Sequence, residues 1–240
     1  MSRSGALRQE REVSAMFGRI VRRYDLMNRL MTGGRDVAWR RLAARTAAGD
    51  GAEKALDVAT GTGDLALDLL EAGAESVIGL DFAPPMIEAA QRKAANEPRA
   101  RFMVGDAMRL PFDDATFDAC TVSFGLRNMA DYQAALNEMS RVLRPGGRLV
   151  CLELTPYRRP VLGRLFGWYF STVVPLVGGV LSGDREAYRY LPASVEGFPD
   201  ARTLAALMSN TGLTGIKWKL LGDGTVALHV GTKPGATSSG

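Results

Sequence analysis

Short apolar runs alternate with amphipathic segments along the first two thirds of the chain. The apolar runs predict strands near residues 54–60, 76–82, 101–105, 117–124 and 147–154. The amphipathic segments predict helices near residues 63–72, 84–96 and 131–143, the last of which is expected to end in a turn at residues 144–147 (RPGG). Strands that alternate with helices in this way are typical of a parallel sheet with crossover helices.

The pattern changes after residue 154. Residues 158–182 form a long apolar stretch, and residues 199–211 have the spacing of an amphipathic helix. Two final strands are expected at 214–221 and 225–232, joined closely enough to form an antiparallel hairpin. Five parallel strands followed by a hairpin are the layout of class I methyltransferases. We therefore expect an α/β, Rossmann-like fold of this class, with a seven-stranded sheet, a C-terminal antiparallel hairpin and a helical cap.

We expect one domain over residues 1–240, because no repeat or low-complexity block divides the chain. Residues 1–48 are interpreted as an N-terminal helical cap, and residues 158–198 as an apolar helical insertion. The most apolar part of the insertion, residues 160–181, is close in length to the ~20 residues that span a bilayer. Within it, Arg164, Pro175 and four glycines make a weak span. We favour a helical cover that binds an apolar ligand or rests on the bilayer surface; a core-packing helix is the alternative.

Residues 56–64 (LDVATGTGD) have the pattern of a buried strand that breaks into a glycine turn before a helix. Gly61 and Gly63 allow tight backbone geometry and close approach of a ligand, which a Cβ atom would hinder. Free N–H groups at the start of the following helix favour an electron-rich or anionic group. We expect a ligand to bind at this turn.

Two nucleoside cofactors fit this turn. Gly61 opens a G-x-G-x-x-A dinucleotide fingerprint, and Asp81 lies 20 residues later, where a ribose-binding carboxylate is expected. S-adenosylmethionine has the same ribose and can use the same layout. Asp57 and Asp64 flank the loop, and carboxylates so placed repel a pyrophosphate and attract a sulfonium. The charge pattern therefore favours S-adenosylmethionine.

Further candidate ligand residues end the next two strands. Asp106 and Ala107 follow the third strand, and Ser123 ends the fourth. Open α/β sheets bind their ligands at the carboxyl ends of the strands. We expect Asp81 to accept hydrogen bonds from the ribose hydroxyls and Asp106 to lie beside the adenine.

Composition narrows the classes of function. The net charge of +4 does not demand a nucleic-acid partner, and no RNA-binding motif accompanies the basic residues. Cys120 and Cys151 lie in apolar runs and are expected to be buried thiols in a reducing compartment. The single histidine, His229, excludes a histidine-rich metal site, and we expect no metal. The charged N-terminus has no secretory pattern, so we expect a cytoplasmic protein.

Three segments carry a family resemblance: residues 24–28 (YDLMN), 123–128 (SFGLRN) and 141–149 (RVLRPGGRL). On these motifs the chain resembles the ubiquinone/menaquinone biosynthesis C-methyltransferase family over residues 17–233. The first two segments are specific to that family, whereas the RPGG turn occurs in many other methyltransferases. The resemblance implies a polyprenylated hydroquinone as methyl acceptor, most commonly demethylmenaquinol.

The resemblance also implies the residues that bind the methyl donor. S-adenosylmethionine is expected to be bound through Thr62, Asp81, Asp106, Ala107 and Ser123, together with the loop residues Gly61, Gly63 and Asp57. Two positions depart from the family pattern. Thr32 replaces the usual serine and keeps a hydroxyl. Asp36 replaces the usual histidine and places an anion there, which argues against a catalytic role at that position.

A hydroquinol carbon becomes a good nucleophile when its ring hydroxyl loses a proton. A phenol has an unperturbed pKa near ~10, so an enzyme at neutral pH must assist that loss. We expect Arg127 to stabilise the phenolate, directly or through a water, while water or a nearby carboxylate accepts the proton. Tyr24, Asn28 and Asn128 are expected to orient the quinol ring. The alternative is that these residues only pack or cap, Arg127 and Asn128 at the turn between strand and helix.

The sequence thus predicts S-adenosylmethionine-dependent C-methylation of demethylmenaquinol to menaquinol, the last step of menaquinone biosynthesis. Methylation of the polyprenyl benzoquinol intermediate in ubiquinone biosynthesis, or of both quinols, stays open. A cofactor-binding regulatory or RNA-binding protein and a quinone oxidoreductase are the other classes considered. We expect no nucleic-acid partner. Peripheral contact with the inner face of the membrane and a homodimer are left open.

Overall fold

The computed structural model describes residues 21, 29, 32–49, 51–156, 194–195 and 197–235. The strands in this part of the chain are β1 (Ala52–Val58), β2 (Ala74–Asp81), β3 (Ala100–Val104), β4 (Phe117–Ser123), β5 (Leu143–Leu154), β6 (Thr214–Leu221) and β7 (Val226–Thr232). The helices are α2 (Arg35–Ala48), α3 (Asp64–Glu71), α4 (Pro84–Lys93), α5 (Tyr132–Arg141) and α9 (Ala201–Ser209), with short 3-10 helices η1 (Leu126–Asn128) and η3 (Gly222–Gly224). The predicted ranges agree with these bounds to within a few residues, apart from the start of β5.

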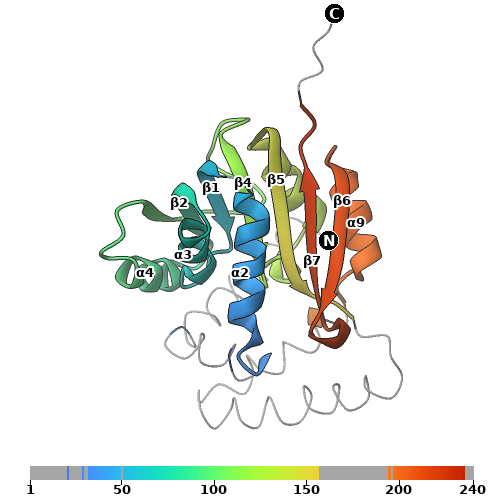
Figure 1. The fold of residues 1–240 in the computed structure, drawn as a ribbon, viewed down its shortest axis with the longest axis horizontal. Coiled ribbons are helices and arrows are strands. Elements are labelled where there is room, and N and C mark those ends of the chain that lie inside the picture. The colour runs from blue at the N-terminus through green and yellow to red at the C-terminus, as the bar shows by residue number, and fades with distance from the viewer. Residues whose placement is uncertain are drawn as a thin grey trace, which may run out of the picture.

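The strands form one sheet in the order β3-β2-β1-β4-β5-β7-β6, with helices on both faces (Figure 1). The first five strands pair in parallel, and β7 runs antiparallel between β5 and β6. The predicted sheet and its C-terminal antiparallel hairpin are therefore confirmed. The strand order reverses between β1 and β4, and such a switch point is where open α/β sheets bind their ligands.

The central strands are buried on both faces of the sheet. Successive residues of a strand point to opposite faces. In β1, Leu56 packs in the core beneath α5 and α9, whereas Ala55 packs in the core beneath α2 and α3. Figure 1 shows α2 crossing this second face in front of β4 and β5, with α3 and α4 to one side. Burial on both faces explains why these strands are near-continuous apolar runs in the sequence.

The start of β5 differs from the prediction. The run at residues 144–147 (RPGG) was expected to be a turn before the strand, but β5 already begins at Leu143 and its register with β4 shifts along this run. Gly146 has a φ of 84°, and its N–H donates to the carbonyl oxygen of Lys233 at 2.8 Å. This bond from the far end of the chain holds the run in the sheet, and no local feature of the run predicts it.

His229 lies in β7 and is fully buried. Its Nε2 lies 2.8 Å from the carbonyl oxygen of Ala201, the first residue of α9, and its ring stacks on Trp218. Burial lowers the pKa of His229. The histidine thus fastens α9 to the sheet.

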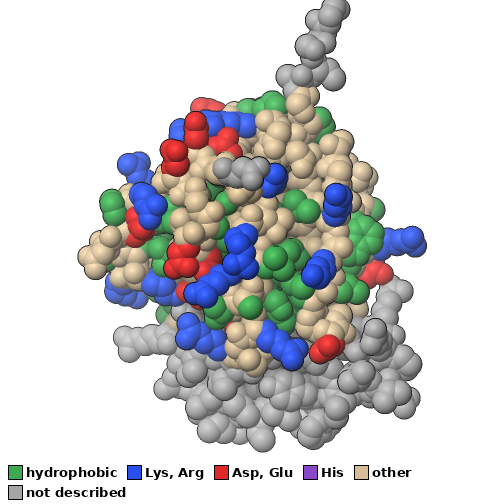
Figure 2. All heavy atoms as spheres, viewed as in Figure 1, with side chains coloured by type: hydrophobic (Ala, Val, Ile, Leu, Met, Phe, Trp, Pro, Cys, Tyr) green, Lys and Arg blue, Asp and Glu red, His purple; other side chains and the backbone are tan. Residues whose placement is uncertain are grey.

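Only part of the two predicted helical additions can be described. Of the N-terminal cap, the described part is mainly α2, which packs on a face of the sheet against α3, β4 and β5. The rest of residues 1–48 and nearly all of residues 158–198 lie outside the described residues. No helix in the described ranges is long and apolar enough to cross a membrane. Figure 2 shows the face that carries α2, where basic side chains are interspersed with acidic and apolar ones.

Candidate active site

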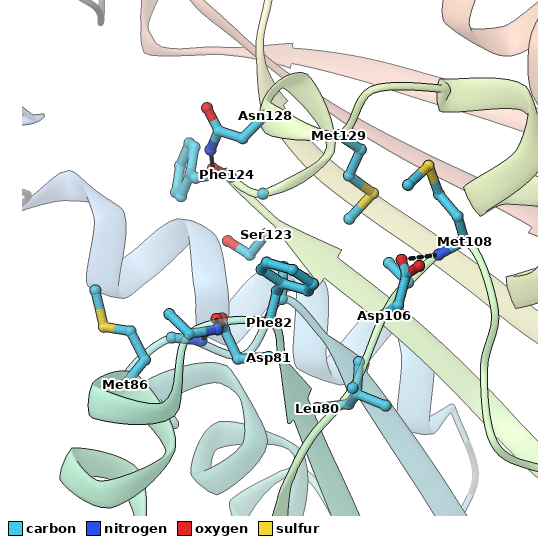
Figure 3. Close-up of a pocket in the computed structure, with 16 residues that line it drawn as sticks. Leu80, Asp81, Phe82, Met86, Asp106, Met108, Ser123, Phe124, Asn128 and Met129 are labelled. Atoms are coloured by element: carbon cyan, nitrogen blue, oxygen red, sulfur yellow. Dashed lines mark hydrogen bonds between the residues drawn. The ribbon is translucent and has the colours of Figure 1, made fainter. Parts of the chain in front are cut away.

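A pocket opens at the carboxyl ends of β1, β2, β3 and β4, where the strand order reverses (Figure 3). The space inside it, open solvent at the mouth included, is about 780 Å³. Each of the four strands contributes the turn that follows it. The lining residues are Ala59, Gly61, Leu80–Ala83, Met86, Gly105–Met108, Ser123–Gly125, Asn128 and Met129.

The glycine loop after β1 forms one wall of this pocket. Gly61 has a φ of 56°, a left-handed conformation that glycine adopts without strain, and its N–H donates to Asp81 Oδ2 at 2.9 Å. Gly63 also has a positive φ, but a Cβ atom there would lie 2.9 Å from the ring of Phe102. Gly61 therefore lies in the pocket wall, whereas Gly63 allows β3 to pack closely against the loop.

Asp81 ends β2 and anchors two turns of the pocket wall. Its Oδ1 accepts from the N–H of Ala83 and its Oδ2 from the N–H of Gly61, each at 2.9 Å. Burial raises the pKa of Asp81, and the backbone N–H groups partly oppose that rise. A carboxylate offers about four acceptor positions, so these bonds leave room for a ligand hydroxyl.

Asp106 and Ala107 lie in the turn after β3. Asp106 Oδ1 accepts from the N–H of Met108 at 2.8 Å, and this bond holds the turn closed. Leu80 and Met108 supply apolar surface beside the carboxylate. An apolar wall with a few fixed polar atoms is suited to a flat heterocycle with polar edges.

Two polar atoms of the lining, Ser123 Oγ and Asn128 Oδ1, are buried and have no hydrogen-bond partner among the described residues. Leaving a buried polar atom unpaired costs about 1–3 kcal/mol, and most such atoms in proteins are paired. Figure 3 shows both side chains near Phe124, whose carbonyl oxygen Asn128 Nδ2 contacts at 3.5 Å. A polar ligand in the pocket would satisfy these two atoms.

Asp57 lies beneath the glycine loop and does not line the pocket. Its Oδ2 accepts from the Thr60 hydroxyl at 2.6 Å, and its Oδ1 accepts from the Thr121 hydroxyl at 2.7 Å. Burial raises the pKa of Asp57 to about 7, although the two hydroxyls lower it in part. In this structure Asp57 joins the loop to β4.

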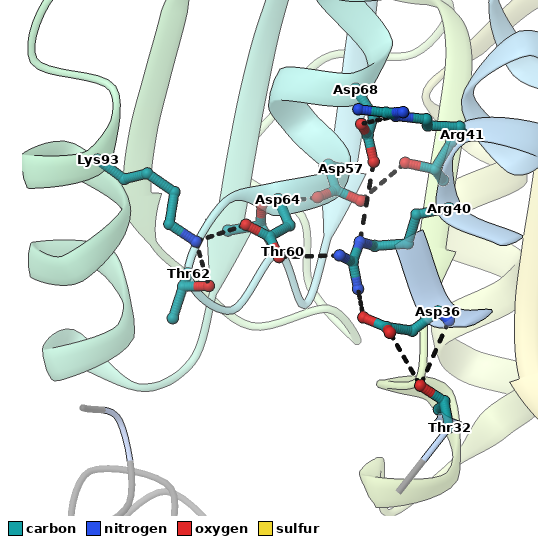
Figure 4. A network of polar contacts seen from close by, with 11 residues as sticks. Thr32, Asp36, Arg40, Arg41, Asp57, Thr60, Thr62, Asp64, Asp68 and Lys93 are labelled. Atoms are coloured by element: carbon teal, nitrogen blue, oxygen red, sulfur yellow. Dashed lines mark hydrogen bonds and ion pairs between the residues drawn. The ribbon is translucent and has the colours of Figure 1, made fainter. Parts of the chain in front are cut away.

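Thr62 contacts α4, where Lys93 Nζ donates to its hydroxyl at 2.9 Å, and it is not among the lining residues. Lys93 also pairs with Asp64, the first residue of α3. Arg40 of α2 lies 3.0 Å from the same Asp64 and 3.8 Å from Asp68 (Figure 4). These contacts tie α2, α3 and α4 to the glycine loop.

Asp36, which stands where the family usually has histidine, belongs to this network. It is almost fully buried, and it accepts from Arg40 Nη1 at 2.6 Å and from the Thr32 hydroxyl at 2.8 Å. The carboxylate at this position therefore neutralises Arg40 and is not part of the pocket lining.

Arg127 lies behind the pocket in a buried ion pair with Glu153. Its Nη1 lies 2.7 Å from Glu153 Oε1 and also donates to the carbonyl oxygen of Phe124. Arg127 is therefore engaged with the protein itself. This geometry supports the alternative in which Arg127 holds the turn after β4. Arg127 Nε is buried without a hydrogen-bond partner among the described residues, and the role of Arg127 toward a phenolate stays a prediction.

The structure brings together six of the candidate residues in the pocket lining: Gly61, Asp81, Asp106, Ala107, Ser123 and Asn128. Four others, Thr62, Gly63, Asp57 and Arg127, lie outside the lining, while Tyr24 and Asn28 lie outside the described residues. Sequence reasoning missed the apolar lining residues, among them Phe82, Met86, Met108, Phe124 and Met129. Phe124 lies in the 123–128 motif that carries the family resemblance, but no sequence signal marks the other four. Gly105 and Gly125 lie at or directly after the ends of predicted strands, which is a signal that could have found them. No metal-binding cluster of histidine, cysteine or acidic residues occurs in the described part of the chain.

Comparison with known proteins decides the family. The model of the ubiE/COQ5 methyltransferase family matches residues 6–233. The chain belongs to this family. It is 50% identical to a demethylmenaquinone methyltransferase of Thermus thermophilus, over 91% of this chain and 100% of that protein. A demethylmenaquinone methyltransferase of Deinococcus radiodurans is 46% identical over 92% of each chain. The resemblance drawn from the sequence motifs is therefore confirmed.

Solved structures show the same fold. A SAM-dependent methyltransferase from Thermotoga maritima has a TM-score of 0.64 at 20% identity, over 91% of this chain and 98% of that chain. A methyltransferase solved with the Haloferax volcanii activator Trm112 has a TM-score of 0.65 at 19% identity, over 91% of this chain and 97% of that chain. The predicted class I methyltransferase fold is confirmed, and family membership makes the protein a methyltransferase.

Proposed function

We propose that this methyltransferase transfers a methyl group from S-adenosylmethionine to a ring carbon of demethylmenaquinol, which gives menaquinol. The observation that carries the proposal is the pair of unpartnered buried atoms, Ser123 Oγ and Asn128 Oδ1, in a pocket that also holds two carboxylates. The naming of the Thermus and Deinococcus relatives as demethylmenaquinone methyltransferases supports the choice of acceptor.

The residues of the pocket fit the methyl donor. Asp81 has room to accept from a ribose hydroxyl, and Gly61 lines the pocket in a left-handed turn that glycine adopts without strain. Ala107 and the apolar residues beside Asp106 provide a surface for the adenine. Ser123 Oγ gains a partner when a polar part of the donor is bound. S-adenosylmethionine supplies an electrophilic methyl group on a positively charged sulfur.

The charge of the donor also suits this end of the sheet. Asp81 and Asp106 line the pocket, and Asp57 lies just beneath its glycine loop. Negative groups at these positions attract a sulfonium cation and repel the pyrophosphate of a dinucleotide. The site therefore supports a methyl donor better than the nicotinamide cofactor of a quinone oxidoreductase.

On the acceptor side, Asn128 is placed to orient the quinol. Its Oδ1 can accept from a ring hydroxyl and so fix the ring relative to the donor. Loss of the proton of the other ring hydroxyl, to water or to a carboxylate of the pocket, makes the ring carbon beside it nucleophilic. After this carbon has taken the methyl group, it releases its own hydrogen as a proton, which restores the aromatic ring. Arg127 contributes by holding the turn that carries Asn128, as its bond to Phe124 indicates. Tyr24 and Asn28 are proposed to complete the quinol site.

The ubiquinone precursor remains the second candidate acceptor, because a Geobacter relative at 42% identity carries the name ubiquinone/menaquinone biosynthesis C-methyltransferase UbiE.

A nucleic-acid partner has less support. On the face shown in Figure 2 the basic side chains are dispersed among acidic ones and form no continuous stripe.

Incubation of the purified full-length protein with deuteromethyl-labelled S-adenosylmethionine tests the proposal. Demethylmenaquinol and the polyprenyl benzoquinol precursor are supplied in separate reactions under reducing conditions, and the lipid extract is measured by mass spectrometry. We expect the label in menaquinol, with Asn128→Ala lowering the rate about 10- to 100-fold. Label only in the benzoquinol product would move the assignment to ubiquinone biosynthesis. Calorimetric binding of NADH but not of S-adenosylhomocysteine would remove the methyl donor altogether.

A further inference from the structure

The Arg127–Glu153 ion pair is buried behind the pocket, between the turn after β4 and the end of β5. The two side chains are 6% and 1% exposed. Glu153 also accepts hydrogen bonds from the backbone N–H of Arg127 at 3.3 Å and from that of Leu154 at 2.8 Å. Its carboxylate is therefore fully engaged in joining β5 to the turn after β4.

The residue that this pair holds is Phe124. It has a φ of 55°, a left-handed conformation that costs a residue other than glycine about 1–3 kcal/mol and that concentrates at functional sites. The N–H of Phe124 donates to the carbonyl oxygen of Leu152 at 2.8 Å, and its own carbonyl oxygen accepts from Arg127. Both peptide groups of Phe124 are thus held by β5. Its N–H is held directly by Leu152, and its carbonyl oxygen is held by Arg127, which pairs with Glu153.

The strained segment forms the pocket wall that carries the unpartnered atoms. Ser123 precedes Phe124 and Asn128 follows it by one turn of η1, and all three line the pocket. If Phe124 relaxed to an ordinary conformation, the chain direction after it would change and Asn128 Oδ1 would leave its position. A shift of about 1 Å in a group that orients a reacting atom can cost about 100-fold in rate.

We propose that Glu153 is a positioning residue for methyl transfer, acting through Arg127 to hold Phe124 and, with it, the wall formed by residues 123–128. The proposal rests on the proposed function for its kinetic consequence. A buried ion pair by itself adds little net stability, because desolvation of the two charges offsets their attraction. The pair instead fixes one conformation of a strained turn.

Glu153→Gln is the direct test, since glutamine keeps the size of the side chain but loses the charge and one acceptor. We expect kcat for quinol methylation to fall about 10- to 100-fold. The KM for S-adenosylmethionine should rise by less than about threefold, because Ser123 is the one proposed donor-binding residue in the wall that the pair holds, whereas Asp81 and Gly61 do not contact the pair. Asp118→Asn is the matched control. It removes a carboxylate that pairs with Arg144 and accepts a backbone N–H at the opposite end of β4, and it should leave both constants unchanged.

A double variant separates positioning from simple loss of stability. Arg127→Leu with Glu153→Leu replaces the ion pair by apolar side chains, an exchange that often preserves stability. We expect the melting temperature of this double variant to stay close to the wild-type value while kcat is low, since nothing then holds the Phe124 carbonyl oxygen. A wild-type kcat in this variant would show that the pair is only structural and would overturn the proposal.

Hydrogen exchange gives a readout that needs no substrate. In Glu153→Gln we expect faster exchange of the Phe124 and Asn128 amides, which are bonded to Leu152 and Gly125, and unchanged exchange in β1 and β2. Unchanged protection at residues 123–128 would overturn the proposal whatever the substrate is. If the wild-type protein methylates no quinol, the proposed function fails, and this measurement still decides the role of Glu153.

Discussion

At the scale of single residues, two left-handed residues other than glycine meet at the pocket: Ala59 after β1, with a φ of 53°, and Phe124 after β4, with a φ of 55°. Their turns touch, because a Cβ atom added to Gly125 would lie 2.5 Å from the Cβ of Ala59. Gly125 itself has a φ of −108°, so its backbone conformation is open to any residue. The lack of a side chain at Gly125 is required by the close approach of the two turns.

Gly125→Ala should therefore damage the pocket by crowding alone. The added methyl group must push the Ala59 and Phe124 turns apart, because the Ala59 Cβ is fixed to the backbone and cannot move independently. We expect a loss of about 1–3 kcal/mol in the free energy of unfolding and weaker binding of S-adenosylhomocysteine. Urea unfolding and calorimetry measure the two effects.

A second substitution, at Ala59, should rescue the Gly125→Ala variant. Ala59→Gly removes the opposing methyl group and supplies a residue that tolerates the positive φ. The double variant Gly125→Ala/Ala59→Gly should recover most of the lost stability and affinity. If the double variant is no better than Gly125→Ala, the contact with Ala59 is not the cause.

Individual site residues could be predicted from the sequence where position along a strand decides their place. Asp81 and Ser123 end parallel strands and Asp106 lies in the turn after another, so their arrival at one edge follows from the topology alone. Thr62 and Arg127 were harder to place, because their directions depend on partners far away in the sequence. Thr62 bonds to Lys93 and Arg127 bonds to Glu153, and neither Thr62 nor Arg127 is in the pocket lining.

At the scale of elements, one arginine joins the helix that precedes the sheet to the helix that follows the glycine loop. Arg40 on α2 is almost buried and lies within ion-pair distance of Asp36, Asp64 and Asp68. Burial raises the pKa of Asp68 to about 6, and the positive charge of Arg40 partly opposes that rise. Removing this cation would leave several carboxylates near one another without their main counter-ion.

Arg40→Met should destabilise the protein while keeping much of the apolar packing of the side-chain stem. We expect a loss of about 2–4 kcal/mol, because Asp36 would then be a buried charge without its cation. Arg41→Met is the matched control. Arg41 is more than half exposed and lies 3.8 Å from Asp68, so its loss should cost less than about 0.5 kcal/mol. Similar melting temperatures for the two variants would contradict this account.

The elements themselves were predictable because their apolar periodicity is strong and local. The hairpin of β6 and β7 follows from two short strands with a glycine-rich connection, and the structure has it. The start of β5 was not predictable from local pattern, since a bond to Lys233 keeps the RPGG run in the sheet. The ion pairs of Arg40 could be predicted only in part, because one partner lies far away in the sequence. Helical spacing predicts the contact with Asp36, but Asp64 lies on another helix.

At the scale of the whole molecule, the binding end of the sheet holds a carboxylate that opposes folding at neutral pH. Asp57 is 1% exposed, and burial raises its pKa to about 7, with the charges of Asp81 and Asp68 adding to the rise. A carboxylate whose folded pKa lies above its unfolded pKa is easier to ionise in the unfolded chain. Its contribution to stability is most favourable below the unfolded value near 4 and is lost as the pH rises toward 7.

Asp57→Asn should therefore stabilise the protein in a pH-dependent way. An amide can still bond to the hydroxyls of Thr60 and Thr121, because each hydroxyl can donate or accept. We expect the variant to match the wild type below about pH 4, to gain stability between about pH 4 and 7, and to be about 1–3 kcal/mol more stable above that range. Urea unfolding at a series of pH values measures this difference.

The same substitution connects stability with binding. If the Asp57 charge attracts the sulfonium, Asp57→Asn should weaken binding of S-adenosylmethionine more than binding of the uncharged thioether product at about pH 8. Asp114→Asn, which removes an exposed carboxylate paired with Arg141, controls for the loss of one negative charge. A stability gain that does not change with pH would contradict the burial of an ionising carboxylate at Asp57. An equal loss of affinity for both ligands would instead show that Asp57 shapes the loop without attracting the cation.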